Sequence, residues 1–276
     1  MTPEPAPSVK VRHCHGLEEF AACVELQRLV WAGADIDVVP LPLFVVAAET
    51  GGQVLGAFAG ERMVGFTMAV AGVREGKPFL HSHMTAVRED YRDRGVGRQL
   101  KLFQRQDALS RDIKLVEWTF DPLELKNAYF NIMRLGAVAR RFLPNCYGIT
   151  TSPLHGGQPT DRLMAEWWLD SPRVEGILAG PRESPIARAA GAAVTQPARA
   201  GDAAVRVRAL ARIRVPGNIG TLRATHPAQA ERIQNEVREQ FHKWLGQGYA
   251  ATGVERTGDG GYYLLELWIG HYERYV

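Results

Sequence analysis

The sequence predicts an α+β fold: a mixed, mostly antiparallel, twisted sheet flanked by helices, with a second, smaller α+β unit after it. Two apolar runs, 53–59 and 63–73, meet at a tight turn around Gly60, which is typical of a hairpin. A strand at 79–87 runs into a glycine loop and then into a helical pattern. After residue 171 the composition changes, which indicates that a second unit begins there.

The first 170 residues alternate short apolar strands with helical patterns. The expected strands cover residues 9–13, 53–59, 63–73, 79–87, 114–120, 137–142 and 163–169. A first helix is expected over 17–31, where apolar residues recur at roughly helical spacing. A later helix is expected over 123–135. Asp121 is its expected cap, Pro122 is expected in its first turn, and Gly136 is expected to end it.

Composition divides the chain into three parts: a disordered N-terminus over 1–7, a domain over 8–170 and a C-terminal α+β unit over 171–276. The start is rich in proline. Residues 180–204 are rich in Ala, Gly, Pro and Arg and show no steady period. We expect this stretch to be a linker or a loosely packed connection.

The C-terminal unit is expected to combine one long helix with three strands. The first strand is expected over 205–215. The helix is expected to begin at Pro227 and to end at Gly246, with one apolar stripe along it. Strands over 249–256 and 262–268 are expected to pair across the TGDGG turn.

Composition and charge exclude several classes of protein. The 276 residues are 46% hydrophobic, enough for one large domain or two small ones. A formal net charge of +3 is too small to indicate a nucleic-acid partner. The three cysteines, Cys14, Cys23 and Cys146, suggest neither a disulfide framework nor a metal site, so we expect no metal. The start resembles no secretory signal and no segment reaches the length of a membrane span, so we expect a cytoplasmic protein without a membrane partner.

The most informative stretch is TAVREDYRDRGVGRQL, at residues 85–100. Gly95 and Gly97 allow the backbone to come close to a ligand, and the following helix points its free N–H groups at the same place. Three arginines, Arg92, Arg94 and Arg98, surround the glycines. Backbone N–H groups, a helix N-terminus and guanidinium groups together favour a phosphate-bearing ligand.

This stretch resembles the coenzyme A signature of the GNAT superfamily of N-acyltransferases. That signature reads Arg or Gln, two residues, Gly, one residue, then Gly or Ala, and here it is RDRGVG at 92–97. The resemblance covers roughly residues 8–170, including the strand at 114–120 and the helix that ends in RLGAV. A dinucleotide fingerprint fits poorly, because its third glycine or alanine would fall at Leu100. A phosphate loop ending in GK and Ser or Thr is absent.

The resemblance implies that acetyl-CoA or another acyl-CoA is the co-substrate. It implies that the backbone of the strand end bonds the pantetheine arm and the acyl carbonyl, and that the loop wraps the pyrophosphate. The residues expected to hold coenzyme A are Ala86, Val87, Arg92, Asp93, Arg94, Gly95, Val96, Gly97, Arg98, Asn127 and Asn131. Asp93 departs from the family pattern by placing a carboxylate near the pyrophosphate; the alternative is that it caps the helix.

The general acid and base are less clearly marked. The family usually has a tyrosine four residues before the glycine that ends the second helix, but Ile132 is there, and Tyr129 is the nearest tyrosine. Our candidate base is His83, which shares a strand face with His81. Glu117 on the neighbouring strand, or Asp121, is the alternative base.

We therefore expect an N-acetyltransferase or related acyltransferase that acts on the amine of a small molecule. Two alternatives stay open: a non-catalytic acyl-CoA-binding module, and an N-succinyltransferase acting on amino acids. Aromatic residues at 167–168 and in the tail 267–276 are expected either to line an acceptor pocket or to be core and edge residues. The C-terminal unit is expected to complete the acceptor pocket, to brace a homodimer, or both.

Overall fold

The computed structural model describes residues 8–32, 34–180 and 210–268. The strands are β1 (Val9–His13), β2 (Gln53–Ala59), β3 (Arg62–Arg74), β4 (Lys77–Val87), β5 (Leu115–Phe120), β6 (Val138–Leu143), β7 (Arg162–Trp168), β8 (Leu210–Pro216), β9 (Tyr249–Thr257) and β10 (Gly260–Leu267). The helices are α1 (Gly16–Trp31), α2 (Leu41–Glu49), α3 (Val96–Ser110), α4 (Leu125–Tyr129), α5 (Pro172–Leu178), α7 (Ile219–Thr225) and α8 (Pro227–Gly246).

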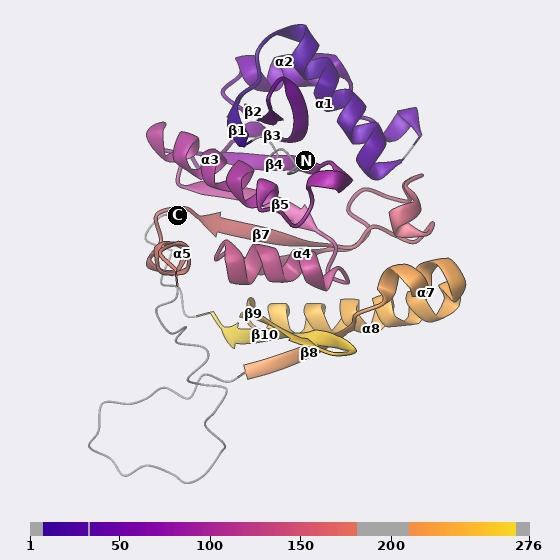
Figure 1. The fold of residues 1–276 in the computed structure, drawn as a ribbon. Helices are drawn as coiled ribbons and strands as arrows, with labels where there is room; N and C mark the ends of the chain where they lie inside the picture. Colours follow the sequence, from indigo (N-terminus) through magenta and orange to yellow (C-terminus); the bar gives the residue numbers. More distant parts are fainter. Residues whose placement is uncertain (1–7, 33, 181–209, 269–276) are drawn as a thin grey trace, which may run out of the picture.

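The strands form one ten-stranded sheet in the order β1-β2-β3-β4-β5-β7-β6-β9-β10-β8 (Figure 1). Within the described part of the chain, β4 and β5 are the one parallel pair, and every other pairing is antiparallel. The expectation of a mixed, mostly antiparallel sheet with flanking helices is confirmed. The strands expected in the first 170 residues are present, with ends shifted by a few residues.

Helices cover both faces of the N-terminal half of the sheet. Neighbouring residues of a strand point to opposite faces. Val54 accordingly packs in the cluster formed with α1 and α2, whereas Leu55 packs in the cluster formed with α3. The two faces therefore carry separate apolar cores, one beneath α1 and α2 and one beneath α3.

The C-terminal unit extends the same sheet. Its strand β9 bridges β6 through the pair Ala139 and Ala251, and α8 packs on β6, β8 and β9. Trp167 of β7, Phe241 of α8 and Tyr263 of β10 belong to one buried cluster. The C-terminal unit therefore shares a core with the strands that precede it. No helix of the described residues is long and apolar enough to cross a membrane.

The helix expected over 123–135 is built differently. It begins at Leu125, not directly after the expected cap, because the Asp121 carboxylate accepts a hydrogen bond from the Leu123 N–H (2.8 Å) and closes a turn there. Pro122 lies in that turn and not in the helix. The second half, Phe130–Arg134, winds as a π-helix before Gly136.

Three helices were not anticipated from the sequence: α2, α5 and α7. Helix α2 reads LPLFVVAAE, a nearly continuous apolar run that has no helical period to detect. The strand expected over 205–215 is described from Leu210 onward, as β8. The expected disorder at 1–7, nearly all of the connection at 180–204 and the tail 269–276 lie outside the described residues.

The buried hydroxyl of Tyr263 joins the two parts of the chain and gives a stability prediction. It donates a hydrogen bond to the Pro122 carbonyl (2.8 Å). Tyr263→Phe leaves that carbonyl without its partner and should lower the free energy of unfolding by about 1–3 kcal/mol. Chemical denaturation measures the change. Tyr262→Phe, at the neighbouring and less buried ring, is the control, and equal losses in both variants would contradict the role of this bond.

Candidate functional site

The site begins where β4 and β5 part. Their pairing is confined to two positions, Leu80 with Val116 and His81 with Glu117. Beyond His81, β4 has a register shift against β3, so that His83 is an extra residue between two paired ones. From Ser82 onward the edge of β4 that faces β5 is therefore open.

A cavity of about 640 Å³ occupies the opening between β4 and β5. One group of lining residues comes from β4, β5, α3 and the helix after β5: Ser82, Gly97, Lys101, Trp118, Asn127 and Asn131. Another group comes from α1, the segment after it and the loop between β6 and β7: Gln27, Trp31, Asp37, Tyr147, His155 and Arg162. The cavity therefore joins the glycine loop to the face that carries α1.

The glycine loop has the local structure that the sequence predicts. Helix α3 begins at Val96, and Gly95 is its N-cap with a φ of 80°, a left-handed conformation that glycine adopts without strain. No side chain caps the helix. A Cβ atom built on Gly97 would meet nothing nearer than Val87 Cγ2 at 3.9 Å. The protein itself therefore does not need glycine at this position, and the space beside it is open to a ligand.

Asp93 does not cap α3, contrary to that alternative. Gly95 holds the N-cap position, and the Asp93 carboxylate instead forms an ion pair with Lys126 of α4 (2.8 Å). This pair ties the glycine loop to α4. Arg92, Arg94 and Arg98 are exposed at the loop, and none of them is paired with a carboxylate of the described residues.

Lys101, one turn beyond Gly97, is the cation of the cavity wall whose pKa is shifted most. Its side chain is buried, with 4% exposed. Its ammonium donates to Ser82 Oγ (2.8 Å) and to Gln104 Oε1 (3.0 Å), and lies 4.1 Å from the centre of the Trp118 ring. Burial lowers the pKa of Lys101 to about 7. Lys101 therefore bridges the first residues of β4 and β5 beyond their last pair.

The helix after β5 turns Asn127 and Asn131 toward the cavity, as the sequence suggested, but not Ile132. In the π-helix, the Leu135 N–H bonds the Phe130 carbonyl and the Ala137 N–H bonds the Asn131 carbonyl. Ile132, expected at the acid position, is fully buried in the core. Asn131, one residue earlier, lines the cavity, and its Nδ2 is buried without a partner among the residues that the structure describes. The acid position of the family therefore carries no proton donor here.

The expected acid and bases lie at different places. His83 lines the cavity, and partial burial of its ring lowers its pKa below the ordinary histidine value. His81 lies beside it, with the ring centres 6.3 Å apart. Glu117 is buried and accepts two hydrogen bonds from Arg74 (2.8 and 2.9 Å) and one from Arg141. Tyr129 lies outside the cavity, with Arg134 and Arg256 over its ring.

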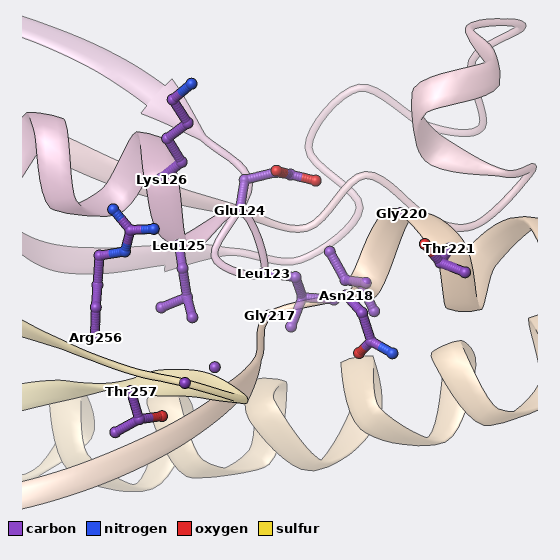
Figure 2. Close-up of a pocket in the computed structure, with 13 residues that line it drawn as sticks. Leu123, Glu124, Leu125, Lys126, Gly217, Asn218, Gly220, Thr221, Arg256 and Thr257 are labelled. Carbon is purple, nitrogen blue, oxygen red and sulfur yellow. The ribbon is translucent and has the colours of Figure 1, made fainter.

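A second, smaller cavity of about 440 Å³ lies between the start of α4 and the C-terminal unit (Figure 2). Leu123–Lys126 line one side, and residues 217–221 with Arg256–Gly258 and Gly260 line the other. Burial, together with the nearby Asp121 charge, raises the pKa of Glu124 in its wall. The residues that line the larger cavity, in contrast, all fall between Gln27 and Arg162. The described C-terminal unit therefore borders the smaller cavity.

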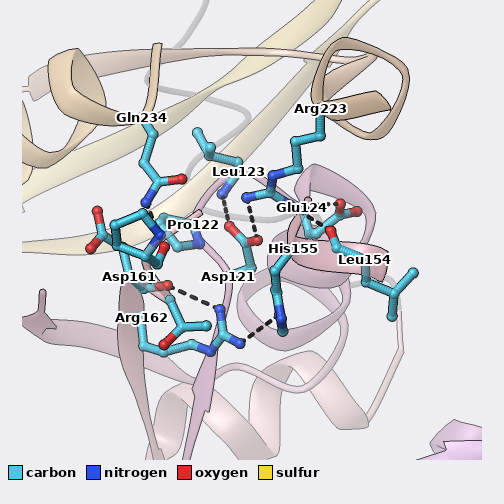
Figure 3. A network of polar contacts seen from close by, with 12 residues as sticks. Asp121, Pro122, Leu123, Glu124, Leu154, His155, Asp161, Arg162, Arg223 and Gln234 are labelled. Atoms are coloured by element: carbon cyan, nitrogen blue, oxygen red, sulfur yellow. Dashed lines mark hydrogen bonds and ion pairs between the residues drawn. The ribbon is translucent and has the colours of Figure 1, made fainter. Parts of the chain in front are cut away.

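The C-terminal unit nevertheless reaches the larger cavity through one ion pair (Figure 3). Arg223 of α7, which is buried, donates to the Asp121 carboxylate (2.8 Å), and Asp121 lines the cavity. Beside this pair, His155 accepts from Arg162 (2.9 Å). Trp167 is a buried core residue, which was one of the two expectations for the aromatic residues at 167–168. Neither Trp167 nor Trp168 lines the cavity.

Comparisons with known proteins bear on the fold. No protein-family model matches the sequence, and no curated protein matches it. The solved structure of FeeM, an N-acyl amino acid synthase from uncultured soil microbes, is similar to that of this chain. The TM-score is 0.50 and the sequence identity 13%, over 63% of this chain and 99% of FeeM. The N-terminal part of this chain has the GNAT fold.

Two further solved structures are similar to the N-terminal part of this chain, with somewhat lower TM-scores. The acetyltransferase of the GNAT family from Streptococcus pneumoniae has a TM-score of 0.46 and 12% identity, over 58% of this chain and 98% of its own. The protein yncA from Salmonella typhimurium, solved with its cofactor acetyl-CoA, has a TM-score of 0.47 and 15% identity, over 59% and 95%. The C-terminal unit lies outside the region shared with the GNAT structures.

The lowered pKa of Lys101 gives a prediction about stability and pH. An unfolded lysine binds its proton up to a pKa of about 10.4, so the cost of burying the ammonium falls as pH rises from about 7 toward that value. Lys101→Met removes this cost. The variant should therefore gain more free energy of unfolding, relative to the parent, at pH 6 than at pH 9, by at least about 1.4 kcal/mol.

Denaturation of both proteins at the two pH values measures this difference. The lost hydrogen bonds to Ser82 and Gln104 lower stability at both values and cancel in the comparison. Lys10→Met, at an exposed position of β1, is the control and should show no such dependence. Equal gains or losses at pH 6 and pH 9 would show that Lys101 is not a titrating buried amine.

Proposed function

We propose that this protein transfers a short acyl group, with acetyl as the first choice, from acyl-coenzyme A to the amine of a small-molecule acceptor. The observation that carries the proposal is the cavity that leads from the glycine loop through the opening between β4 and β5. Through this cavity, a thin, phosphate-bearing acyl donor and an amine acceptor can reach the same place between the strands from two separate sides.

The residues of the loop fit coenzyme A. The open space beside Gly97 admits a pyrophosphate, and the uncapped N–H groups at the start of α3 point toward it. Arg92 and Arg98 add positive charge. The open edge of β4 toward Val87, with Ala86, offers backbone groups to the pantetheine amides, and Asn127 and the unpartnered Asn131 Nδ2 offer side-chain groups. Acyl-coenzyme A supplies the acyl group as a thioester.

The two proton transfers of the reaction take place on opposite faces of the sheet. His81 precedes Ser82, whose hydroxyl bonds Lys101 on the α3 face, so the His81 side chain points to the face that carries α1. The His83 ring lies beside that of His81 (6.3 Å) and therefore serves the same face. There His83, neutral near pH 7, accepts the ammonium proton of the acceptor. The neutral amine nitrogen then bonds the acyl carbon, the carbon–sulfur bond breaks, and the nitrogen releases its second surplus proton to solvent. Lys101, on the other face, is the group that returns a proton to the sulfur.

The fold supports this reaction class. FeeM, which has the fold, is named an N-acyl amino acid synthase, and acyl transfer to an amine is the reaction that we extend to this chain. A non-catalytic acyl-CoA-binding module is the second candidate, because Tyr129 lies outside the cavity. Release of free thiol in the presence of an amine distinguishes the two.

The first prediction for this function concerns Gly97. Gly97→Val should place a side chain in the proposed pyrophosphate position and weaken coenzyme A binding at least tenfold, or about 1.4 kcal/mol. Folding should be unaffected, because the protein leaves this position open. Titration calorimetry with coenzyme A measures the effect. Gly176→Val, at another open position, is the control, and unchanged affinity in a folded Gly97→Val would refute the assignment.

The second prediction concerns pH. A base must be neutral to accept a proton, so kcat/KM should rise with pH through the pKa of His83, which lies below the ordinary histidine value. His83→Gln should remove this rise and lower kcat/KM by about 100-fold. His81→Gln should keep the parent profile. If His83→Gln keeps the profile and Glu117→Gln loses it, the base is Glu117.

A further inference from the structure

Arg162, the first residue of β7, presents an uncompensated positive charge in the wall of the larger cavity (Figure 3). Its side chain is almost entirely buried, with 9% exposed. It donates to the Asp161 carbonyl (3.1 Å) and to His155 Nε2 (2.9 Å). Among the residues that the structure describes, no carboxylate is paired with it.

Three acids that adjoin Arg162 in the chain or line the same cavity already have other partners. Asp161 accepts two hydrogen bonds from Arg238 (2.8 and 3.0 Å), and Asp121 accepts one from Arg223 (2.8 Å). Asp37 accepts hydrogen bonds from the Thr151 N–H (2.7 Å) and from the Thr151 hydroxyl. Asp161 and Asp121 therefore each balance a different guanidinium, and Asp37 is held by Thr151. A buried charge without a partner is costly, so its retention in a cavity wall calls for a ligand of opposite charge.

His155 orients Arg162 and does not neutralise it. The Arg162 N–H donates to His155 Nε2, so His155 carries its proton on Nδ1, which donates to Thr150 Oγ1 (2.7 Å). Burial and the Arg162 charge lower the pKa of His155. Tyr147 places its ring 5.7 Å from the guanidinium carbon. Neutral groups thus hold the guanidinium at the cavity, with N–H groups left for a ligand.

The alternation of the strands places Arg162 on the acceptor side. Trp118 and Leu163 belong to the core on the face of α3 and α4. Their neighbours Thr119 and Arg162 therefore point to the opposite face, where the Thr119 hydroxyl meets Tyr147 (2.8 Å). His83 points to this same face.

From these contacts we propose that Arg162 binds a carboxylate of the acceptor, so that the acceptor is an amino-acid-like molecule with an amine and a carboxylate. A guanidinium suits this role because its planar N–H groups match the two carboxylate oxygens. The inference rests on the proposed acyl transfer and narrows its acceptor. A carboxylate at the free end of a dicarboxylic acyl group is the other source of the same chemistry, and the experiment separates the two.

The experiment compares free amino acids with their primary amides as acceptors, with acetyl-CoA as donor and release of free thiol as the readout. The amide keeps the amine and side chain but has no carboxylate. We expect the best amino acid to exceed its amide at least tenfold in kcat/KM. Because the amide also has a less basic amine, the decisive quantity is how Arg162→Met changes this ratio.

Arg162→Met should lower kcat/KM for the acid at least tenfold and leave that for the amide within about twofold, whereas Arg162→Lys should restore part of the preference. Arg105→Met, which removes a half-buried arginine that donates to the Leu169 carbonyl and does not line the cavity, is the matched control and should keep the parent ratio. Unchanged coenzyme A affinity shows that a variant is folded. If Arg162→Met does not fold, Arg162→Gln, which also removes the charge but keeps a polar side chain, supplies the same comparison.

Three results overturn the inference in distinguishable ways. Equal losses for acid and amide make Arg162 structural, and a parent without preference for the acid refutes the carboxylate site. If Arg162→Met lowers the use of succinyl-CoA but not of acetyl-CoA with an amide acceptor, the carboxylate belongs to the acyl group. If no acceptor, acid or amide, releases thiol while coenzyme A still binds, the proposed transfer itself fails.

Discussion

The parting of β4 and β5 is the constraint on which the rest of the site depends. Two residue pairs join these parallel strands. At the paired end, the buried Glu117 of β5 accepts hydrogen bonds from Arg74 and Arg141. The extra residue at His83 then turns β4 away from its neighbour. Because the strands separate there, the Lys101 ammonium lies between them on the α3 face of the sheet, and His83 lines the cavity on the opposite face. A sheet paired along its full length would leave no cavity at this point.

The sequence was most informative where the signal is local. Glycine at 95 and 97, the arginines around them and the strand before them predicted the strand, the loop and the start of the helix correctly, and the ligand class of the loop stays a prediction. The spacing of Asn127 and Asn131 predicted that both face the cavity, whereas the π-helix could not be predicted, because a one-residue widening leaves no mark on composition. Lys101 could have been noticed, since it lies one helical turn after Gly97. Its burial could not, because that depends on Ser82 and Trp118 from two strands.

The acceptor side of the cavity is assembled from distant parts of the chain, which explains why its residues escaped detection. Arg162, His155 and Tyr147 come from the loop between β6 and β7 and the start of β7, and Trp31 comes from α1. Arg223 arrives from α7 to hold Asp121. The C-terminal unit therefore acts on the cavity through this ion pair and through the bond from Tyr263 to Pro122, which fix the chain just after β5.

The most direct test of the account is a crystal structure of the protein with coenzyme A bound. The account predicts that the pyrophosphate lies on the N–H groups at the start of α3, beside Gly97, and that the pantetheine arm follows the open edge of β4. The thiol should then lie in the larger cavity, between His83 and Lys101. Coenzyme A bound elsewhere, or strands β4 and β5 closed together over Ser82 and Trp118, would contradict it.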